Sequence, residues 1–166
     1  MSATLGIDLG ERRIGIAIAE DPEARALALT TIRRGRDVPT DVRALRALIE
    51  ASDVERLVIG LPIDAAGHEG PQAERTREWA HGVRAALGDA VAIELQDERL
   101  TSHVAESRLG PMPRGRSGGP PTRQQRDTYR ARVDREAAAI ILQDFLDSRR
   151  ASASHPRRSS TMEPRP

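Results

Sequence analysis

The 166-residue sequence contains no cysteine and no lysine. The absence of cysteine excludes disulfide bonds, thiolate metal sites and a cysteine nucleophile. The chain also has only one tryptophan, one tyrosine and one phenylalanine, so its core must be built from Ala, Leu, Ile and Val. The same shortage disfavours nucleic-acid recognition by stacking of bases on an aromatic platform.

Long apolar runs are missing as well. No run approaches the ~20 residues that a membrane-spanning helix needs, and the N-terminus lacks the basic segment followed by an apolar one that marks export. We therefore expect a cytoplasmic protein with no membrane partner. At 18.1 kDa the chain is long enough for one core of ordinary size, which predicts one domain over residues 1–147.

The basic residues are unevenly distributed, although the net charge is only +1. Arginines outnumber acids twelve to six from Gly110 onward. Residues 110–126 are rich in Pro, Gly and Arg without apolar periodicity, which predicts a mobile loop. Residues 148–166 have the composition of a disordered basic tail. Both segments could follow a nucleic-acid backbone; the alternative is solvated disorder without a partner.

Asp8 interrupts an otherwise regular hairpin pattern in Leu5–Glu20. Apolar residues alternate on either side of a polar turn, which predicts two antiparallel strands. A lone carboxylate inside the first strand costs several kcal/mol unless a cation or hydrogen-bond donors meet it. Asp8 therefore indicates a bound ion or substrate, and the alternative is an acid that ends a strand or caps a turn.

The remaining pattern predicts an α/β protein with a five-stranded mixed sheet, flanked by helices. Three antiparallel strands come first, and two parallel strands reached by helical crossovers follow. The expected later strands are residues 26–32, 57–61 and 91–95. The expected helices are residues 41–51, 71–87 and 101–109, with a last helix that begins near 128–132 and ends near 147.

Three further acids fall where sites form in such sheets. Asp97 and Glu98 come just after the last predicted strand, and Asp134 shares a helix face with Ala138 and Ile141, so it should point toward the sheet. Carboxylates from three separate elements suit a hard cation such as Mg²⁺ or Mn²⁺. Two such ions about 3.5–4 Å apart support phosphodiester hydrolysis. The alternative is that these acids cap turns or pair with the abundant arginines.

Four segments of the sequence stand out: GIDLGERRIGIA, GLPIDAAGHEGPQAER, DERLTSHVA and VDREAAAIILQDFLD. In sequence and in order they resemble the signature blocks of the YqgF/RuvX family, whose members are described as pre-16S rRNA nucleases and as similar to Holliday junction resolvases. The resemblance implies a ribonuclease H-like fold and a metal-dependent hydrolase that trims the 5′ end of the 16S rRNA precursor during ribosome biogenesis.

By position, the resemblance implies that Asp8, Glu98 and Asp134 are catalytic and hold the metal together with Asp97. Adjacent residues of an extended segment face opposite ways, so only one of Asp97 and Glu98 can be a principal ligand, and we favour Glu98. Three arginines near these acids are candidates for substrate binding: Arg12, Arg13 and Arg99.

Three other interpretations remain open. The substrate could be branched DNA, as for a Holliday junction resolvase. The chain could be an RNA-binding assembly factor without catalysis. GIDLG also resembles the first phosphate loop of the actin-like and sugar-kinase ATPases, but those proteins need two such domains and a hydroxyl residue in the turn, where this chain has Arg12 and Arg13.

Overall fold

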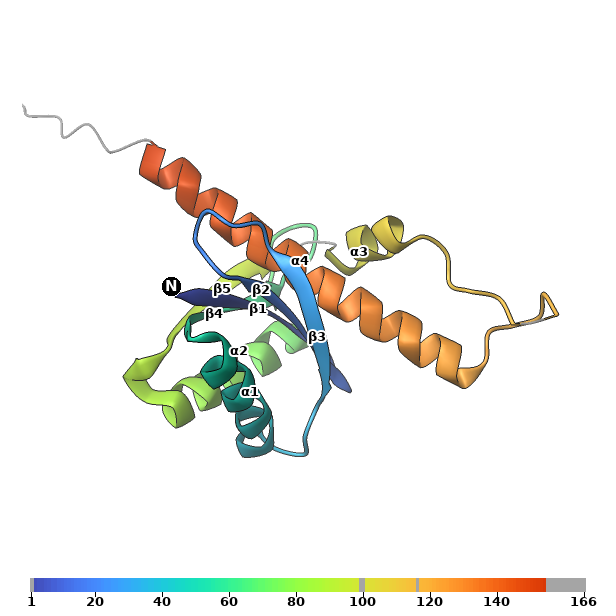
Figure 1. Ribbon diagram of the computed structural model, residues 1–166, viewed down its shortest axis with the longest axis horizontal. Coiled ribbons are helices and arrows are strands. Elements are labelled where there is room, and N and C mark those ends of the chain that lie inside the picture. The colour runs from blue at the N-terminus through green and yellow to red at the C-terminus, as the bar shows by residue number, and fades with distance from the viewer. Residues whose placement is uncertain (1, 99–100, 116, 155–166) are drawn as a thin grey trace, which may run out of the picture.

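The computed structural model describes residues 2–98, 101–115 and 117–154, and its centre is a five-stranded sheet with helices on both faces (Figure 1). The strands are β1 (Ala3–Leu9), β2 (Arg13–Ala19), β3 (Leu27–Arg33), β4 (Val54–Pro62) and β5 (Ala92–Glu98). The helices are α1 (Val38–Ser52), α2 (Pro71–Leu87), a short 3₁₀ turn η1 (Gly88–Ala90), α3 (Thr101–Leu109) and α4 (Arg123–Ser154).

The strand order β3-β2-β1-β4-β5 confirms the predicted mixed sheet. β2 pairs antiparallel with both β1 and β3, whereas β4 pairs parallel with β1 and with β5. The crossovers from β1 to β4 and from β4 to β5 bring the ends of these three strands to one edge of the sheet.

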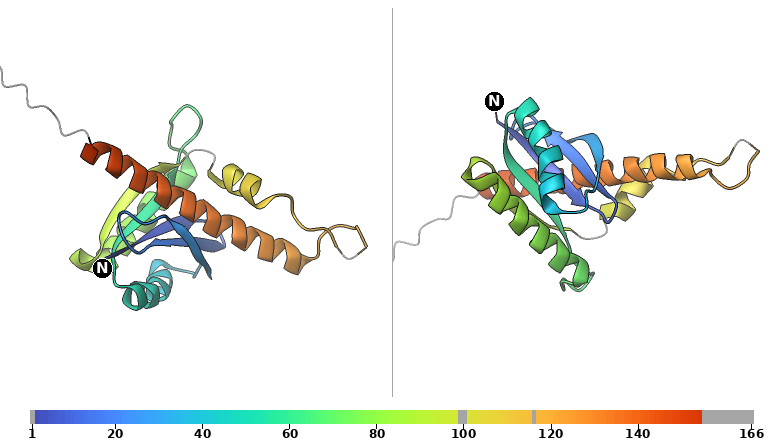
Figure 2. Two further views of the ribbon diagram at one scale, coloured as in Figure 1. Left: turned by 45° about the horizontal axis from the view of Figure 1, so that its top comes forward. Right: turned by 90° about the horizontal axis from the view of Figure 1, so that it is seen from below.

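Side chains of the central strands alternate between two cores. Leu5 and Ile7 of β1 pack with α1 and α2, in a core that also contains the buried Trp79. The intervening residues of β1, Gly6 and Asp8, face the other side, where Ala138 of α4 belongs to a second apolar core. Figure 2 shows α4 crossing this second face of the sheet.

Small residues on the second face allow α4 to lie directly on the strand backbones. A Cβ atom added to Gly6 would lie 2.6 Å from the carbonyl oxygen of Ala138, and one added to Gly15 would lie 2.0 Å from the carbonyl oxygen of Asp134. Real Cβ atoms do not approach that closely, so glycine at these two positions sets the distance between α4 and the sheet.

Strand β5 and helix α4 are longer than the sequence pattern predicts. β5 continues to Glu98, so Asp97 and Glu98 belong to the strand and do not follow it. Helix α4 begins at Arg123 and ends at Ser154, so residues 123–126 of the predicted loop and 148–154 of the predicted tail are helical. Residues 155–166 lie outside the described residues.

Local hydrogen bonds explain the extra length of α4. The backbone N–H of Thr122 donates to the side-chain oxygen of Gln125 at 2.8 Å, and the N–H of Gln125 donates to the Thr122 hydroxyl at 3.2 Å. This reciprocal pair is a capping box, which fixes a helix start. At the other end, Arg150 donates to the carbonyl oxygens of Pro22 at 2.9 Å and Ala24 at 3.1 Å. These contacts tie the last turns to the loop that follows β2.

Candidate active site

Asp8 lies next to the end of β1 with its side chain on the α4 face of the sheet. Its neighbour across the hairpin is Gly15 of β2. Because glycine has no side chain, the space above this strand pair is left to the Asp8 carboxylate and to α4.

Glu98 reaches the same face from β5. It pairs with Pro62 of β4, two pairs beyond Gly60 and Gln96. A Cβ atom added to Gly60 would lie 2.6 Å from Oε2 of Glu98 and 2.5 Å from the end of the Ile141 side chain. Glycine at position 60 therefore leaves room for the Glu98 side chain to lie across β4, in the direction of Asp8 on β1.

Asp134 approaches from above, on the part of α4 that lies over Gly15. The Nε of Arg13 donates to Oδ2 of Asp134 at 2.6 Å, and both side chains are about three-quarters buried, with exposed fractions of 25% and 22%. This ion pair links the start of β2 to the helix and gives Asp134 a fixed cationic partner.

The charges of Glu98 and Asp134 act on Asp8, which places the three acids on the same face of the sheet. Burial raises the pKa of Asp8 from its ordinary value of 3.8 to about 8, and the negative charges of Glu98 and Asp134 contribute to the same shift. Burial also raises the pKa of Glu98, against which a hydrogen bond from Thr101 acts in the lowering direction. A carboxylate whose pKa is raised by burial and by neighbouring negative charge is stabilised in its ionised form by a nearby cation.

The carboxylates of Asp8, Glu98 and Asp134 have the right chemistry to bind a divalent cation, but only two of them are placed to share one. Carboxylate oxygens are the ligands that Mg²⁺ and Mn²⁺ prefer, and none of the described residues donates a hydrogen bond of regular geometry to the Asp8 carboxylate. Within residues 2–98, 101–115 and 117–154, however, no three acidic or histidine side chains are close enough to share one ion. Asp8 and Glu98 are the available ligands, because Asp134 is held by Arg13.

Asp97 does not belong to this group. Its side chain is exposed on the opposite face of the sheet, the face that α2 covers. There the hydrogen bond and charge of Glu69 raise the pKa of Arg77, and the charge of Asp97 adds a smaller contribution. The alternation of β5 therefore places Glu98 with Asp8 and places Asp97 on the other side, as expected for adjacent strand residues.

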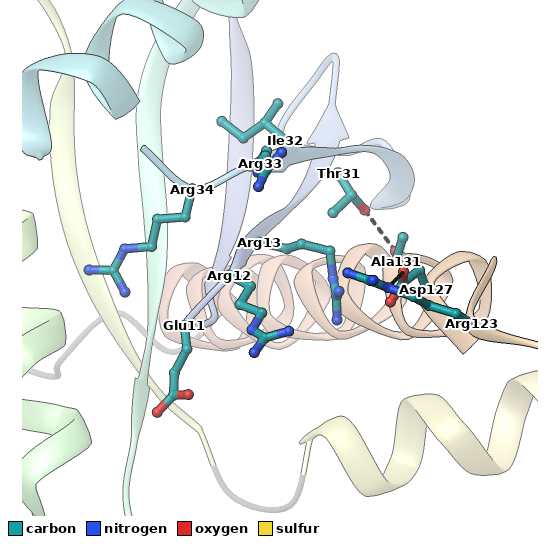
Figure 3. Close-up of a pocket in the computed structure, with 10 residues that line it drawn as sticks. All are labelled: Glu11, Arg12, Arg13, Thr31, Ile32, Arg33, Arg34, Arg123, Asp127 and Ala131. Carbon is teal, nitrogen blue, oxygen red and sulfur yellow. Dashed lines mark hydrogen bonds and ion pairs between the residues drawn. The ribbon is translucent and has the colours of Figure 1, made fainter. Parts of the chain in front are cut away.

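The three arginines predicted to bind substrate differ from one another in their surroundings. Arg12 is exposed in the turn between β1 and β2, Arg13 holds Asp134, and Arg99 lies outside the described residues. Arg12 and Arg13 line an open hollow of ≈ 620 Å³ between the β2–β3 hairpin and the first turns of α4 (Figure 3). The sequence analysis missed Arg33 and Arg123 in this hollow, since no local pattern shows that β3 and α4 meet there.

Within the described residues, no helix has the length and apolar character needed to cross a lipid bilayer.

The hollow beside Asp134 is lined by charged side chains from both sides.

Comparison with known proteins gives matches over nearly the whole chain. The sequence profile of the RuvX family, described as Holliday junction resolvase, matches residues 2–148. A protein of Anaeromyxobacter sp. (strain K), named "Putative pre-16S rRNA nuclease", is 45% identical over 146 residues, which cover 88% of this chain and 97% of that protein. A protein of the same name from Syntrophus aciditrophicus (strain SB) is 40% identical over 144 residues, which cover 87% of each chain.

A solved structure shows the same fold. The RuvC protein of T. thermophilus, in complex with a Holliday junction substrate, superimposes with a TM-score of 0.52 over 90% of this chain and 97% of that chain, at 14% sequence identity. The expectation of a ribonuclease H-like fold is thereby confirmed.

Proposed function

This chain belongs to the RuvX family, and on that premise we propose that it is a metal-dependent nuclease that hydrolyses phosphodiester bonds of RNA. Its substrate in this proposal is the 5′ region of the 16S rRNA precursor. The curated relatives that are 40–45% identical carry that activity in their names, and they match this chain over most of its length.

The position of Asp8, Glu98 and Asp134 on one face of the sheet is the observation that supports the proposal most directly. These residues come from β1, β5 and α4. Glycine at position 60 leaves room for the Glu98 side chain, and glycine at position 15 lets the part of α4 that carries Asp134 lie close to β2. Stability alone does not favour an acid whose pKa is raised by burial to about 8. Strongly shifted groups of this kind are typical of catalytic sites.

In this proposal Asp8 and Glu98 hold the ion, which is Mg²⁺ or Mn²⁺. A divalent cation at this position would supply positive charge to a bridging phosphate and activate a water molecule for attack on phosphorus. Asp134 and Arg13 form the side of the site nearest the hairpin turn. From there Arg13 is positioned to orient a phosphate group.

Cleavage of an end-labelled 16S rRNA precursor tests the proposal. We expect wild-type protein to cut it only when Mg²⁺ or Mn²⁺ is present, and we expect Asp8→Asn and Glu98→Gln to reduce the rate at least about 100-fold. Asp97→Asn is the matched control, because Asp97 is adjacent in sequence but lies on the other face of the sheet. Full activity of Asp8→Asn would contradict the proposal.

A branched DNA substrate is the second candidate, since the family is described as Holliday junction resolvase. Parallel digestion of a four-way DNA junction and of the rRNA precursor separates the two substrates. Tight binding of RNA without turnover in either metal ion would instead identify an assembly factor without catalysis.

A further inference from the structure

The hollow beside the three carboxylates is strongly basic. Five arginines and two acids line it, together with Thr31, Ile32 and Ala131. The arginines come from three separate elements: Arg12 and Arg13 from the hairpin turn, Arg33 and Arg34 from the end of β3, and Arg123 from the first turn of α4 (Figure 3). The local field therefore favours an anion.

Two of these arginines already have a structural partner. Arg34 donates to the carbonyl oxygen of Gly10 at 3.0 Å and lies 3.9 Å from the buried Asp41, and Figure 3 shows its side chain turned away from Arg12 and Arg13. Arg13 is bound to Asp134. These contacts shape the wall of the hollow on the hairpin side.

The other three arginines are available to a ligand. Arg12 and Arg33 are exposed and form no ion pair with any residue that the structure describes. Arg123 has an 89% exposed side chain and only a distant partner, Asp127, at 3.9 Å. Exposed pairs at that distance contribute little to stability. Arg123 also lies at the N-terminus of α4, where the helix dipole adds to the attraction for anions.

The hollow and the carboxylates are joined along one face of α4. Asp127 and Ala131 line the hollow, and Asp134 follows on the same side of the helix at offsets of seven and three residues. Seven residues of α-helix rise about 10 Å. A single nucleic-acid strand can therefore reach both the hollow and the carboxylates within a few nucleotides.

We propose that Arg12, Arg33 and Arg123 bind a backbone phosphate of the substrate strand, within a few nucleotides of the phosphate that is cleaved. This inference rests on the proposed nuclease function and adds to it a second anchoring point. No aromatic side chain lines the hollow, and the hydroxyl of Thr31 donates to the carbonyl oxygen of Ala131 at 2.7 Å. The anchor therefore holds the backbone and does not read the base.

Salt-dependent RNA binding is the first test. Full-length protein is titrated into a short fluorescent RNA in EDTA, which prevents metal-dependent cleavage, at salt concentrations between about 50 and 200 mM. We expect Arg33→Gln and Arg123→Gln each to weaken binding about 5- to 10-fold at the lowest salt, and to reduce the slope of log affinity against log salt by about 1. Arg43→Gln is the matched control, since Arg43 is exposed on α1 in the opposite layer.

A scan with neutral linkages gives the position of the anchor without changing the protein. A methylphosphonate that replaces one phosphate of the RNA should weaken wild-type binding most at one position within a few nucleotides of the cleavage site. At that same position it should have a smaller effect on Arg33→Gln, which has already lost one of the three arginine contacts. Equal binding of wild type and both variants, or a flat scan, would overturn the anchor.

The same proteins distinguish failure of the anchor from failure of the nuclease assignment. If wild type does not cleave RNA when Mg²⁺ replaces EDTA, the nuclease assignment fails, whatever the binding curves show. If wild type cleaves and the arginine variants bind and cleave like it, only the anchor fails.

Discussion

Asp8 is the single residue whose ionisation should control the stability of the protein. Its folded pKa of about 8 exceeds the unfolded value of 3.8, so the group contributes stability below about pH 4 that is lost as the pH rises through 8. For a shift of this size, the metal-free protein should lose about 3 kcal/mol of unfolding free energy between pH 5 and pH 8.

The substitution Asp8→Asn should remove that loss. In EDTA, the difference in unfolding free energy between the variant and wild type should shift by about 3 kcal/mol in favour of the variant from pH 5 to pH 8, because the amide does not ionise. Urea denaturation at the two pH values measures the difference. Asp97→Asn, at an exposed position, should follow wild type at both. Parallel pH dependence of wild type and Asp8→Asn would show that Asp8 is not shifted.

Gly15 and Gly60 leave the space that helix α4 and the Glu98 side chain occupy. Gly15→Ala would place a Cβ atom 2.0 Å from the carbonyl oxygen of Asp134, and α4 would have to move. We expect a loss of about 2 kcal/mol or more in unfolding free energy, together with weaker cleavage. Gly119→Ala is the control, since nothing lies within 4 Å of an added Cβ there. A stable and fully active Gly15→Ala variant would contradict the close approach of helix and strand.

At the scale of elements, helix α4 connects the candidate site to the basic hollow. Its 32 residues span about 48 Å, so the same helix carries Arg123 in the hollow and Asp134 at the carboxylates. Buried apolar residues of its first half, including Tyr129 and Val133, pack with α3. The N-terminal turns of α4 are therefore stabilised by packing against α3 as well as against the sheet.

The capping box at Thr122 is the device that begins this helix. Thr122→Ala removes the hydroxyl that accepts from the N–H of Gln125, and we expect a cost of about 1 kcal/mol. Hydrogen exchange of the amides in the first turn of α4 should become faster. Unchanged exchange in that turn would mean that the packing with α3 alone fixes the helix start.

The elements that the sequence predicted well have strong local signals. Pro71 and Gly88 frame α2, which runs from Pro71 to Leu87 as expected, and Gly88 adopts the positive φ of 65° that favours glycine after a helix. The start of α4 was predicted too late, because the Thr122–Gln125 pair lies inside a segment dominated by Pro, Gly and Arg. The Thr122–Gln125 pair, with the spacing of a capping box, was the sequence signal that marks the start of α4.

The candidate site was predictable in its residues and less so in its geometry. The alternation of the strands is enough to separate Glu98 from Asp97 and to place Asp8 opposite the apolar core. No local pattern could predict that Arg13 would take Asp134 as its partner, since the two residues are 121 positions apart in sequence. The same holds for the contact of β3 with the first turns of α4.

At the scale of the whole molecule, the fold concentrates negative charge that a cation should stabilise. We expect Mg²⁺ or Mn²⁺ to raise the melting temperature of wild type, and to raise it more at pH 8 than at pH 5, because only the ionised carboxylates bind the ion. Asp8→Asn should respond much less at either pH. An equal rise in both proteins would indicate binding elsewhere on the surface.

The most direct test of the account is a crystal structure of the wild-type protein grown with Mn²⁺ at pH 8, with anomalous difference maps at the manganese absorption edge. The account predicts a peak on the α4 face of the sheet, within coordination distance of carboxylate oxygens of both Asp8 and Glu98. A map at saturating Mn²⁺ with no peak there, or with a peak only at Asp97 on the opposite face, would contradict it.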